Sequence, residues 1–66
     1  MNKSDKNHFL ANGGILLRKG EDRYGKPIIK ARTKAKDWHP YSKHSSKKER
    51  DGHFTYLLTN ENYKED

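Results

Sequence analysis

The segment from Lys30 to Arg50 holds the side chains of this sequence that are best suited to binding phosphate groups. It contains eight of the fifteen lysine and arginine residues and only two acidic residues, Asp37 and Glu49. This segment therefore accounts for the whole formal net charge of +6. Affinity for nucleic acid depends mainly on neutralising phosphates, so cations gathered in one segment indicate a surface for a polyanion. The cations are Lys30, Arg32, Lys34, Lys36, Lys43, Lys47, Lys48 and Arg50.

Two aromatic side chains, Trp38 and Tyr41, lie within the same basic segment. A base stacked on such a ring contributes about 1–3 kcal/mol to the binding of single-stranded nucleic acid. An indole could instead cover the open end of a small sheet and supply apolar area, and we favour this packing role for Trp38. Tyr41 and Tyr24 are then the freer candidates for stacking.

Two functions are consistent with these residues. The first is that of a small, non-enzymatic RNA-binding or DNA-binding protein, which contacts phosphates through residues 30–50 and reads few bases. Single-stranded nucleic acid suits it better than duplex, because the sequence shows no recognition helix. The second is that of a small accessory or inhibitor protein, of a bacterial, phage or mobile-element kind, whose basic loop docks on an acidic surface of a partner protein. A solvated loop without a partner would also account for the lysines.

The four histidines raise the question of metal binding and catalysis. Their spacing matches no zinc-binding pattern and the chain has no cysteine, so we expect neither a metal nor another cofactor. A metal-free ribonuclease would need a base, an acid and a cation, roles that His39, His53 and Arg32 have the chemistry to fill. Nothing in the sequence brings these three together, and we predict that the protein is not an enzyme.

The length of the chain, 66 residues, predicts one small domain over residues 1–66. A domain of this size buries only roughly 60% of the surface that its unfolded chain exposes, so its stability should be marginal. Without cysteine no disulfide can compensate, and a bound ligand or a homodimer could complete the fold. The chain has neither a signal-peptide pattern nor an apolar run of membrane-spanning length, which predicts a cytoplasmic protein without a membrane partner.

Strands are the elements that must position the basic segment. We expect a β-rich fold: a three- or four-stranded antiparallel sheet with a long basic loop, residues 34–52, before its last strand. The expected strands cover residues 14–19, 27–33 and 53–59, within a folded core of residues 9–59. A short helix over residues 45–51, capped by Ser45 or Ser46, is an alternative for part of the loop. Residues 1–8 are expected to form a flexible arm and residues 60–66 a flexible acidic tail.

The segment before the first strand has two interpretations. Residues 5–11 could form a short helix, with Ser4 as its N-cap and Gly13 at its C-terminal end. Alternatively, Asn12 and Gly13 could form the tight turn of a β-hairpin. Both interpretations depend on packing of the preceding apolar side chains against the sheet, because so short a helix is unstable alone.

Alternation along the expected strands assigns their side chains to two faces. One face of the second strand should be core and the other partly cationic. The core side consists of Ile29, Ala31 and Thr33, and the other side of Ile28, Lys30 and Arg32. The last strand should add Phe54, Tyr56 and Leu58 to the core side.

Overall fold

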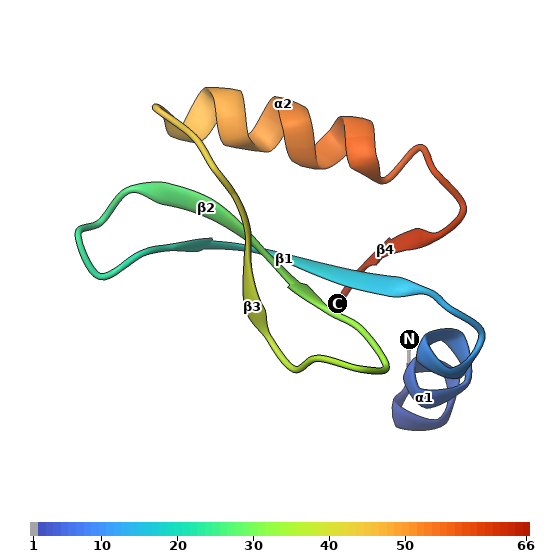
Figure 1. Cartoon of the computed structure of the whole chain (residues 1–66). Coiled ribbons are helices and arrows are strands. Elements are labelled where there is room, and N and C mark those ends of the chain that lie inside the picture. Colours follow the sequence, from blue (N-terminus) through green and yellow to red (C-terminus); the bar gives the residue numbers. More distant parts are fainter. Residues whose placement is uncertain (1) are drawn as a thin grey trace.

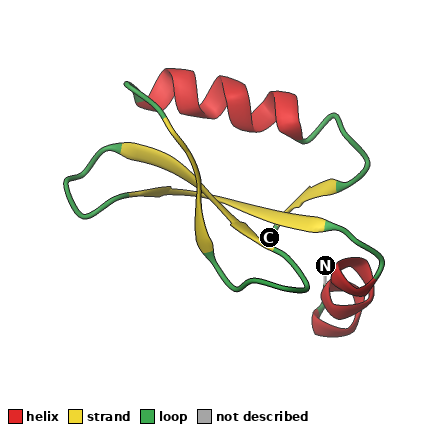
Figure 2. Cartoon of the chain, viewed as in Figure 1, coloured by secondary structure: helices red, strands yellow, loops and turns green. Residues whose placement is uncertain are grey.

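The computed structural model describes residues 2–66, which form two helices and a four-stranded sheet (Figure 1 and Figure 2). The strands lie in the order β3-β2-β1-β4. β2 pairs antiparallel with both β1 and β3, but β4 runs parallel to β1. The expected small β-rich fold is thus confirmed, whereas the sheet is mixed and not purely antiparallel. In chain order the elements are α1 (Lys3–Ala11), β1 (Ile15–Glu21), β2 (Pro27–Arg32), β3 (His39–Lys43), α2 (Lys47–Leu57) and β4 (Tyr63–Glu65).

The N-terminal segment is helical, which decides between its two interpretations in favour of the helix. The N-cap of α1 is Asn2 and not Ser4, because the Asn2 side chain accepts a hydrogen bond of 2.8 Å from the backbone N–H of Asp5. The expected arm over residues 1–8 is therefore wrong from Lys3 onward, and residue 1 lies outside the described residues.

Two glycines end α1 and turn the chain into the sheet. Gly13 has a φ of +86°, in the left-handed region that side chains disfavour. At Gly14 an added Cβ would lie 2.5 Å from the Phe9 ring, so this ring packs directly on the backbone. Leu10, the buried residue of α1, lies next to this turn.

α2 occupies a region for which the sequence predicted a basic loop followed by a strand. Both predictions are wrong over Lys47–Leu57, and the short-helix alternative identified only the beginning of this helix. The Ser46 side chain caps it by accepting a hydrogen bond of 3.1 Å from the backbone N–H of Glu49.

Burial along α2 follows a helical period instead of strand alternation. Apolar residues at 54, 56 and 58 mimic a strand, but the buried positions are Arg50, Phe54 and Leu57, which share one helix face. Tyr56, expected in the core, is 69% exposed. The apparent strand is therefore a helix whose exposed side carries an aromatic residue.

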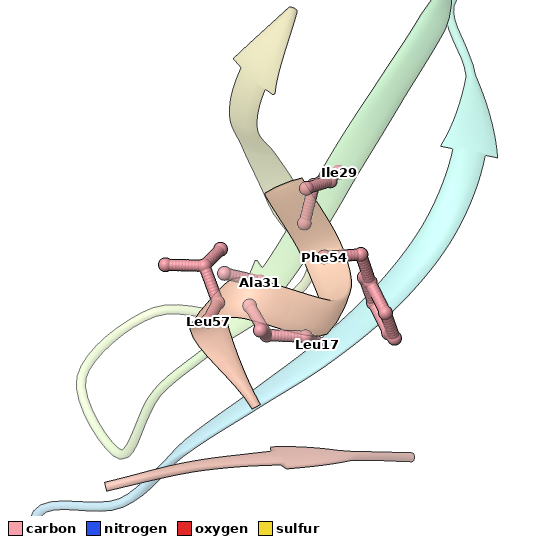
Figure 3. Close-up of a cluster of buried hydrophobic side chains, with 5 residues drawn as sticks. All are labelled: Leu17, Ile29, Ala31, Phe54 and Leu57. Carbon is pink, nitrogen blue, oxygen red and sulfur yellow. The ribbon is translucent and has the colours of Figure 1, made fainter. Parts of the chain in front are cut away.

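α2 packs across one face of the sheet and forms the main core with it (Figure 1 and Figure 3). The expected core side of β2 is confirmed for Ile29 and Ala31. Within residues 2–66 no helix is both long and apolar enough to cross a membrane. The core cluster consists of Leu17, Ile29, Ala31, Phe54 and Leu57.

The C-terminal segment adds the fourth strand, where the sequence predicted only an acidic tail. Tyr63–Glu65 pairs in parallel with the start of β1, Ile15 lying opposite Tyr63. The backbone N–H of Asp66 then donates a hydrogen bond of 3.0 Å to the carbonyl of Leu17. Three residues are too few for a strand pattern to show in the sequence, and pairing with β1 defines this element.

Candidate nucleic-acid interface

The sheet face opposite α2 gathers basic side chains from all four strands. Residues directly paired across strands point to the same side, so Arg18 shares this side with its partner Lys30. By the same rule Lys43 lies there beside Ile28, and Lys64 beside Leu16. We call this surface the open face. It comprises Leu16, Arg18, Gly20, Ile28, Lys30, Arg32, Pro40, Lys43 and Lys64.

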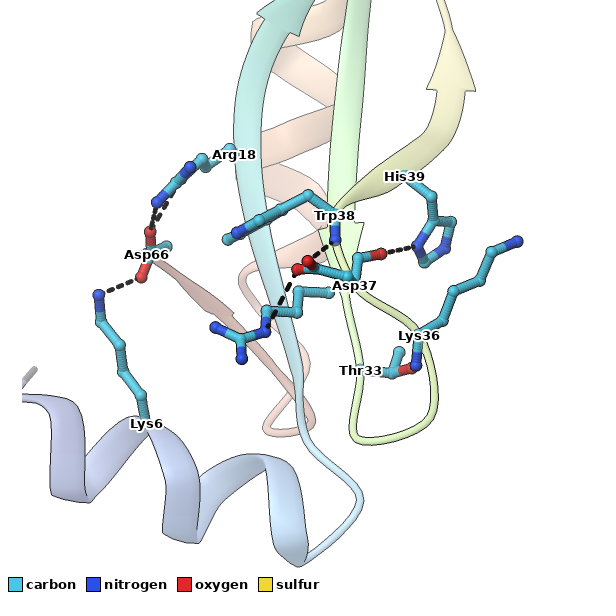
Figure 4. Close-up of polar contacts among 9 residues, drawn as sticks. Lys6, Arg18, Thr33, Lys36, Asp37, Trp38, His39 and Asp66 are labelled. Atoms are coloured by element: carbon cyan, nitrogen blue, oxygen red, sulfur yellow. Dashed lines mark hydrogen bonds and ion pairs between the residues drawn. The ribbon is translucent and has the colours of Figure 1, made fainter.

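The composition of the open face separates it from the face beneath α2. Five of its nine residues are cations and none is acidic. α1 covers only one end, where the Lys64 ammonium lies 5.0 Å from the centre of the Phe9 ring. Figure 4 shows this side of the sheet, with the ribbon of α2 passing behind the strands. Leu16 and Ile28 are buried within this face, so the surface left to a ligand is formed mainly by its cations.

The expected cations divide between the open face and α2. Lys30, Arg32 and Lys43 belong to the open face. Lys34 and Lys36 are exposed in the connection between β2 and β3, which continues from it. Five of the eight are therefore carried by one hairpin, the unit formed by β2 and β3.

The other three predicted cations lie on α2 and do not reach the open face. Lys47 and Lys48 are exposed in the first turn of the helix. Arg50 is only 8% exposed, and its Nη1 donates a hydrogen bond of 2.8 Å to the carbonyl of Gly20. Its Nε also donates to the Asp51 carboxylate at 3.1 Å. Arg50 therefore ties α2 to β1 and is removed from the binding set, because its guanidinium is already occupied.

Trp38 lies in contact with a cation of the open face and is not part of the buried core. The Arg18 guanidinium stands 4.2 Å from the centre of the indole ring, and the two side chains lie side by side in Figure 4. The backbone N–H of Trp38 donates a hydrogen bond of 2.8 Å to the Asp37 carboxylate, which orients the backbone next to the indole. Trp38 is half-buried, so part of the ring stays available for stacking.

Tyr41 belongs to the other side of the sheet. Its hydroxyl lies 3.1 Å from that of Tyr63, whose ring packs against the core beneath α2. The hydrogen bond to Tyr63 and burial raise the pKa of Tyr41. Tyr41 and Trp38 therefore do not form one stacking platform. Tyr24 is 74% exposed at the tip of the β1–β2 hairpin, where the Asp22 carboxylate accepts two backbone hydrogen bonds.

Three cations of this region were missed at the sequence level: Lys6, Arg18 and Lys64. Arg18 could have been found, because it follows the apolar run Ile15–Leu17 and alternates with the core residue Leu17. Lys64 could not, since it lies in the acidic segment that the sequence predicted to be a tail. Lys6 comes from α1, which only the fold brings to this edge of the sheet.

The Asp66 carboxylate is an acidic group at the edge of the open face. One of its oxygens accepts hydrogen bonds from Nε of Arg18, at 2.8 Å, and from Nη2 of the same guanidinium. The other oxygen forms an ion pair with the Lys6 ammonium (Figure 4). The hydrogen bond from Lys6 and then the one from Arg18 hold the pKa of Asp66 below its ordinary value.

A second polar cluster joins the end of β3 to α2. Nε2 of His44 lies 2.8 Å from Oγ of Ser42, and Nδ1 lies 3.5 Å from the Glu49 carboxylate. Hydrogen bonds from Ser45 and then His44 lower the pKa of Glu49. This order of groups resembles a hydrolase triad, but the His44 side chain is only 8% exposed and Ser42 is half-buried. The cluster therefore joins the end of β3 to the first turn of α2.

Two of the three residues considered for ribonuclease roles, Arg32 and His53, lie on opposite sides of the sheet. Arg32 is on the open face and pairs with Asp37 at 3.7 Å. His53 is on α2, across the sheet, where its ring lies 5.1 Å from that of His44. Among residues 2–66 no group of three His, Asp or Glu side chains could hold a metal ion.

Comparisons of the chain with protein-family models, with curated proteins and with solved structures found no match. The chemistry of the open face is therefore the basis for assigning a function. It offers arginine and lysine donors, a half-buried indole and, at its edge, one carboxylate held by two cations.

Proposed function

We propose that this protein binds single-stranded nucleic acid on the open face, without catalysis and mainly through phosphate contacts. The observation that carries the proposal is the segregation of charge on the sheet. α2 covers one face with apolar contacts, while the strands contribute five cations to the other face, of which Arg18 and Arg32 are paired with Asp66 and Asp37 at its edge.

The spacing of these cations suits a phosphate backbone. Neighbouring strands lie about 4.8 Å apart, and alternate residues of one strand about 7 Å apart. Arg18 and Lys30 face each other across β1 and β2, and Arg32 follows Lys30 two residues along β2. A flexible strand could therefore meet one cation after another, extended by Lys34 and Lys36 at the hairpin end.

A single strand fits this surface better than a duplex. The helix that packs on the sheet, α2, lies on the opposite side and carries its buried arginine toward the sheet, so it does not act as a recognition helix. Trp38 offers part of one ring beside Arg18, which allows a base to stack next to its own phosphate contact. Few other groups on the open face could read a base edge, so little sequence specificity is expected.

The rival function is docking on an acidic protein as an accessory factor or regulator. The carboxylates of an acidic partner would bind the same surface, since carboxylates and phosphates both attract arginine. The two functions differ in what they require of the ligand: nucleic acid needs a run of phosphates, whereas a protein partner needs one complementary shape.

The test is a salt titration of binding. Labelled oligonucleotides of RNA and single-stranded DNA are titrated with the protein, with a duplex and a lysine-rich peptide of charge +6 as comparisons. If about five cations contact phosphates, the logarithm of the affinity should fall with the logarithm of salt concentration at a slope of about −3.5. Binding no tighter than that of the peptide would reject the proposal and favour a protein partner, and preference for the duplex would reject the single-strand assignment.

A further inference from the structure

We infer that Arg18 and Lys6 form a subsite for one phosphate group, and that the Asp66 carboxylate occupies this subsite while the protein is free. The inference rests on the proposed function, because it names one phosphate position on the same surface and a regulator of it. Neither cation belongs to the basic segment 30–50, so the subsite is separate from the cations expected there.

The geometry around Asp66 is that of an oxyanion site. Arg18 directs Nε and Nη2 to one carboxylate oxygen, and the Lys6 ammonium meets the other (Figure 4). A guanidinium presents its N–H groups in a fixed fork that fits the oxygens of a carboxylate or a phosphate. Trp38, stacked 4.2 Å from the guanidinium, holds the fork in place on the open face.

The exposure of the three groups shows which of them a ligand could reach. The Asp66 side chain is 6% exposed, whereas the side chains of Arg18 and Lys6 are 52% and 31% exposed. The cations therefore enclose the carboxylate yet remain accessible from solvent. A phosphate could approach both cations and replace Asp66 without a change in the strand pairing of β1.

The other ion pair beside the open face lacks this geometry. Arg32 and Asp37 lie 3.7 Å apart, and the Asp37 side chain is 86% exposed. Such a solvated pair competes weakly with a ligand. Within residues 2–66 neither Lys30 nor Lys43 has a carboxylate within 4.0 Å, so Asp66 is the competitor expected to matter.

The experiment compares Asp66→Asn with Glu65→Gln. Both variants remove one negative charge from neighbouring positions, but Glu65 lies opposite Leu17, on the core side of the sheet. Freeing the two cations of this subsite should add one phosphate contact, so Asp66→Asn should bind single-stranded oligonucleotide about 5-fold more tightly at 0.1 M salt, with a salt slope steeper by about 0.7. Glu65→Gln should leave the salt slope unchanged. The gain must also require the arginine, so Asp66→Asn combined with Arg18→Gln should bind no more tightly than Arg18→Gln alone.

A second readout separates this inference from the proposed function. Inorganic tripolyphosphate is titrated into each variant while the NMR signal of the Arg18 Nε–H is followed, with thermal melting as a check of folding. Asp66→Asn should bind tripolyphosphate more tightly than Glu65→Gln does. Equal affinities of these two variants for both ligands would overturn the inference. If no variant binds an oligonucleotide but Asp66→Asn binds tripolyphosphate more tightly, the subsite stands and the nucleic-acid function fails.

Discussion

The two faces of the sheet differ in burial and in charge, although β2 contributes residues to both. In β2, Ile29 and Ala31 are buried beneath α2, while Lys30 and Arg32, which alternate with them, lie on the open face. Burial under α2 excludes water from apolar groups and stabilises the fold. On the open face Leu16 and Ile28 are also buried, but the cations are exposed or half-exposed, so substitutions of these cations should alter binding far more than stability. This contrast can be tested by changing one face at a time.

The largest expected effect is on the covered face. Phe54→Ala removes a ring that is 2% exposed, and should lower the free energy of unfolding by about 3–5 kcal/mol, enough to unfold so small a domain. Tyr56→Ala, two residues away on the exposed side of α2, should change it by less than about 0.5 kcal/mol. Denaturant unfolding of both variants measures the difference. Comparable losses of unfolding free energy in the two variants would contradict the helix and favour the strand that the sequence pattern predicted over residues 53–59.

The sequence pattern of residues 53–59 is compatible with both a strand and a helix, which is why the strand predicted there is wrong. Phe54, Tyr56 and Leu58 alternate as in a strand, while Phe54 and Leu57 also satisfy a helical period. The residue that completes the helical face is Arg50, and a cation is a weak signal of burial. Its partner, the carbonyl of Gly20, lies thirty residues away in the chain, so no local pattern could identify it.

The open face could be predicted in part. Alternation in β2 correctly separated its core side from its cationic side before the strand partners were known. The contributions of Arg18 and Lys64 depend on the order of the strands and on β4, a strand of three residues. The contact between Arg18 and Asp66 joins residues 48 positions apart, and such a pair follows only from the assembled fold.

Arg50 should behave as a residue of the covered face, although it lies in the basic segment. Arg50→Gln should lower the free energy of unfolding by about 1–3 kcal/mol, because its hydrogen bond to the carbonyl of Gly20 is lost in a buried position. Lys48→Gln, an equal change of charge on the exposed side of the same helix, should have little effect. Thermal and denaturant unfolding compare them, and equal stability of the two variants would contradict a structural role for Arg50.

A smaller effect should appear in acid, at the edge of the open face. Because the folded pKa of Asp66 is lowered, its ionised form contributes stability above its unfolded pKa of about 4. That contribution is lost as the pH falls through the folded pKa. Unfolding of the wild type should therefore become easier between pH 7 and pH 2 by a larger margin than unfolding of Asp66→Asn. Parallel pH profiles would show that the contacts with Lys6 and Arg18 do not persist in solution.

The most direct test of the contrast between the two faces uses two pairs of lysines. Lys30→Gln with Lys43→Gln removes two charges from the open face, and Lys47→Gln with Lys48→Gln removes two from the exposed surface of α2. Salt titrations of single-stranded oligonucleotide binding compare the two double variants, with melting temperatures to confirm folding. The open-face variant should lose about 1.4 from the salt slope, corresponding to two phosphate contacts, while the α2 variant keeps the wild-type slope. Equal losses, or a larger loss in the α2 variant, would contradict the assignment of the open face as the binding surface.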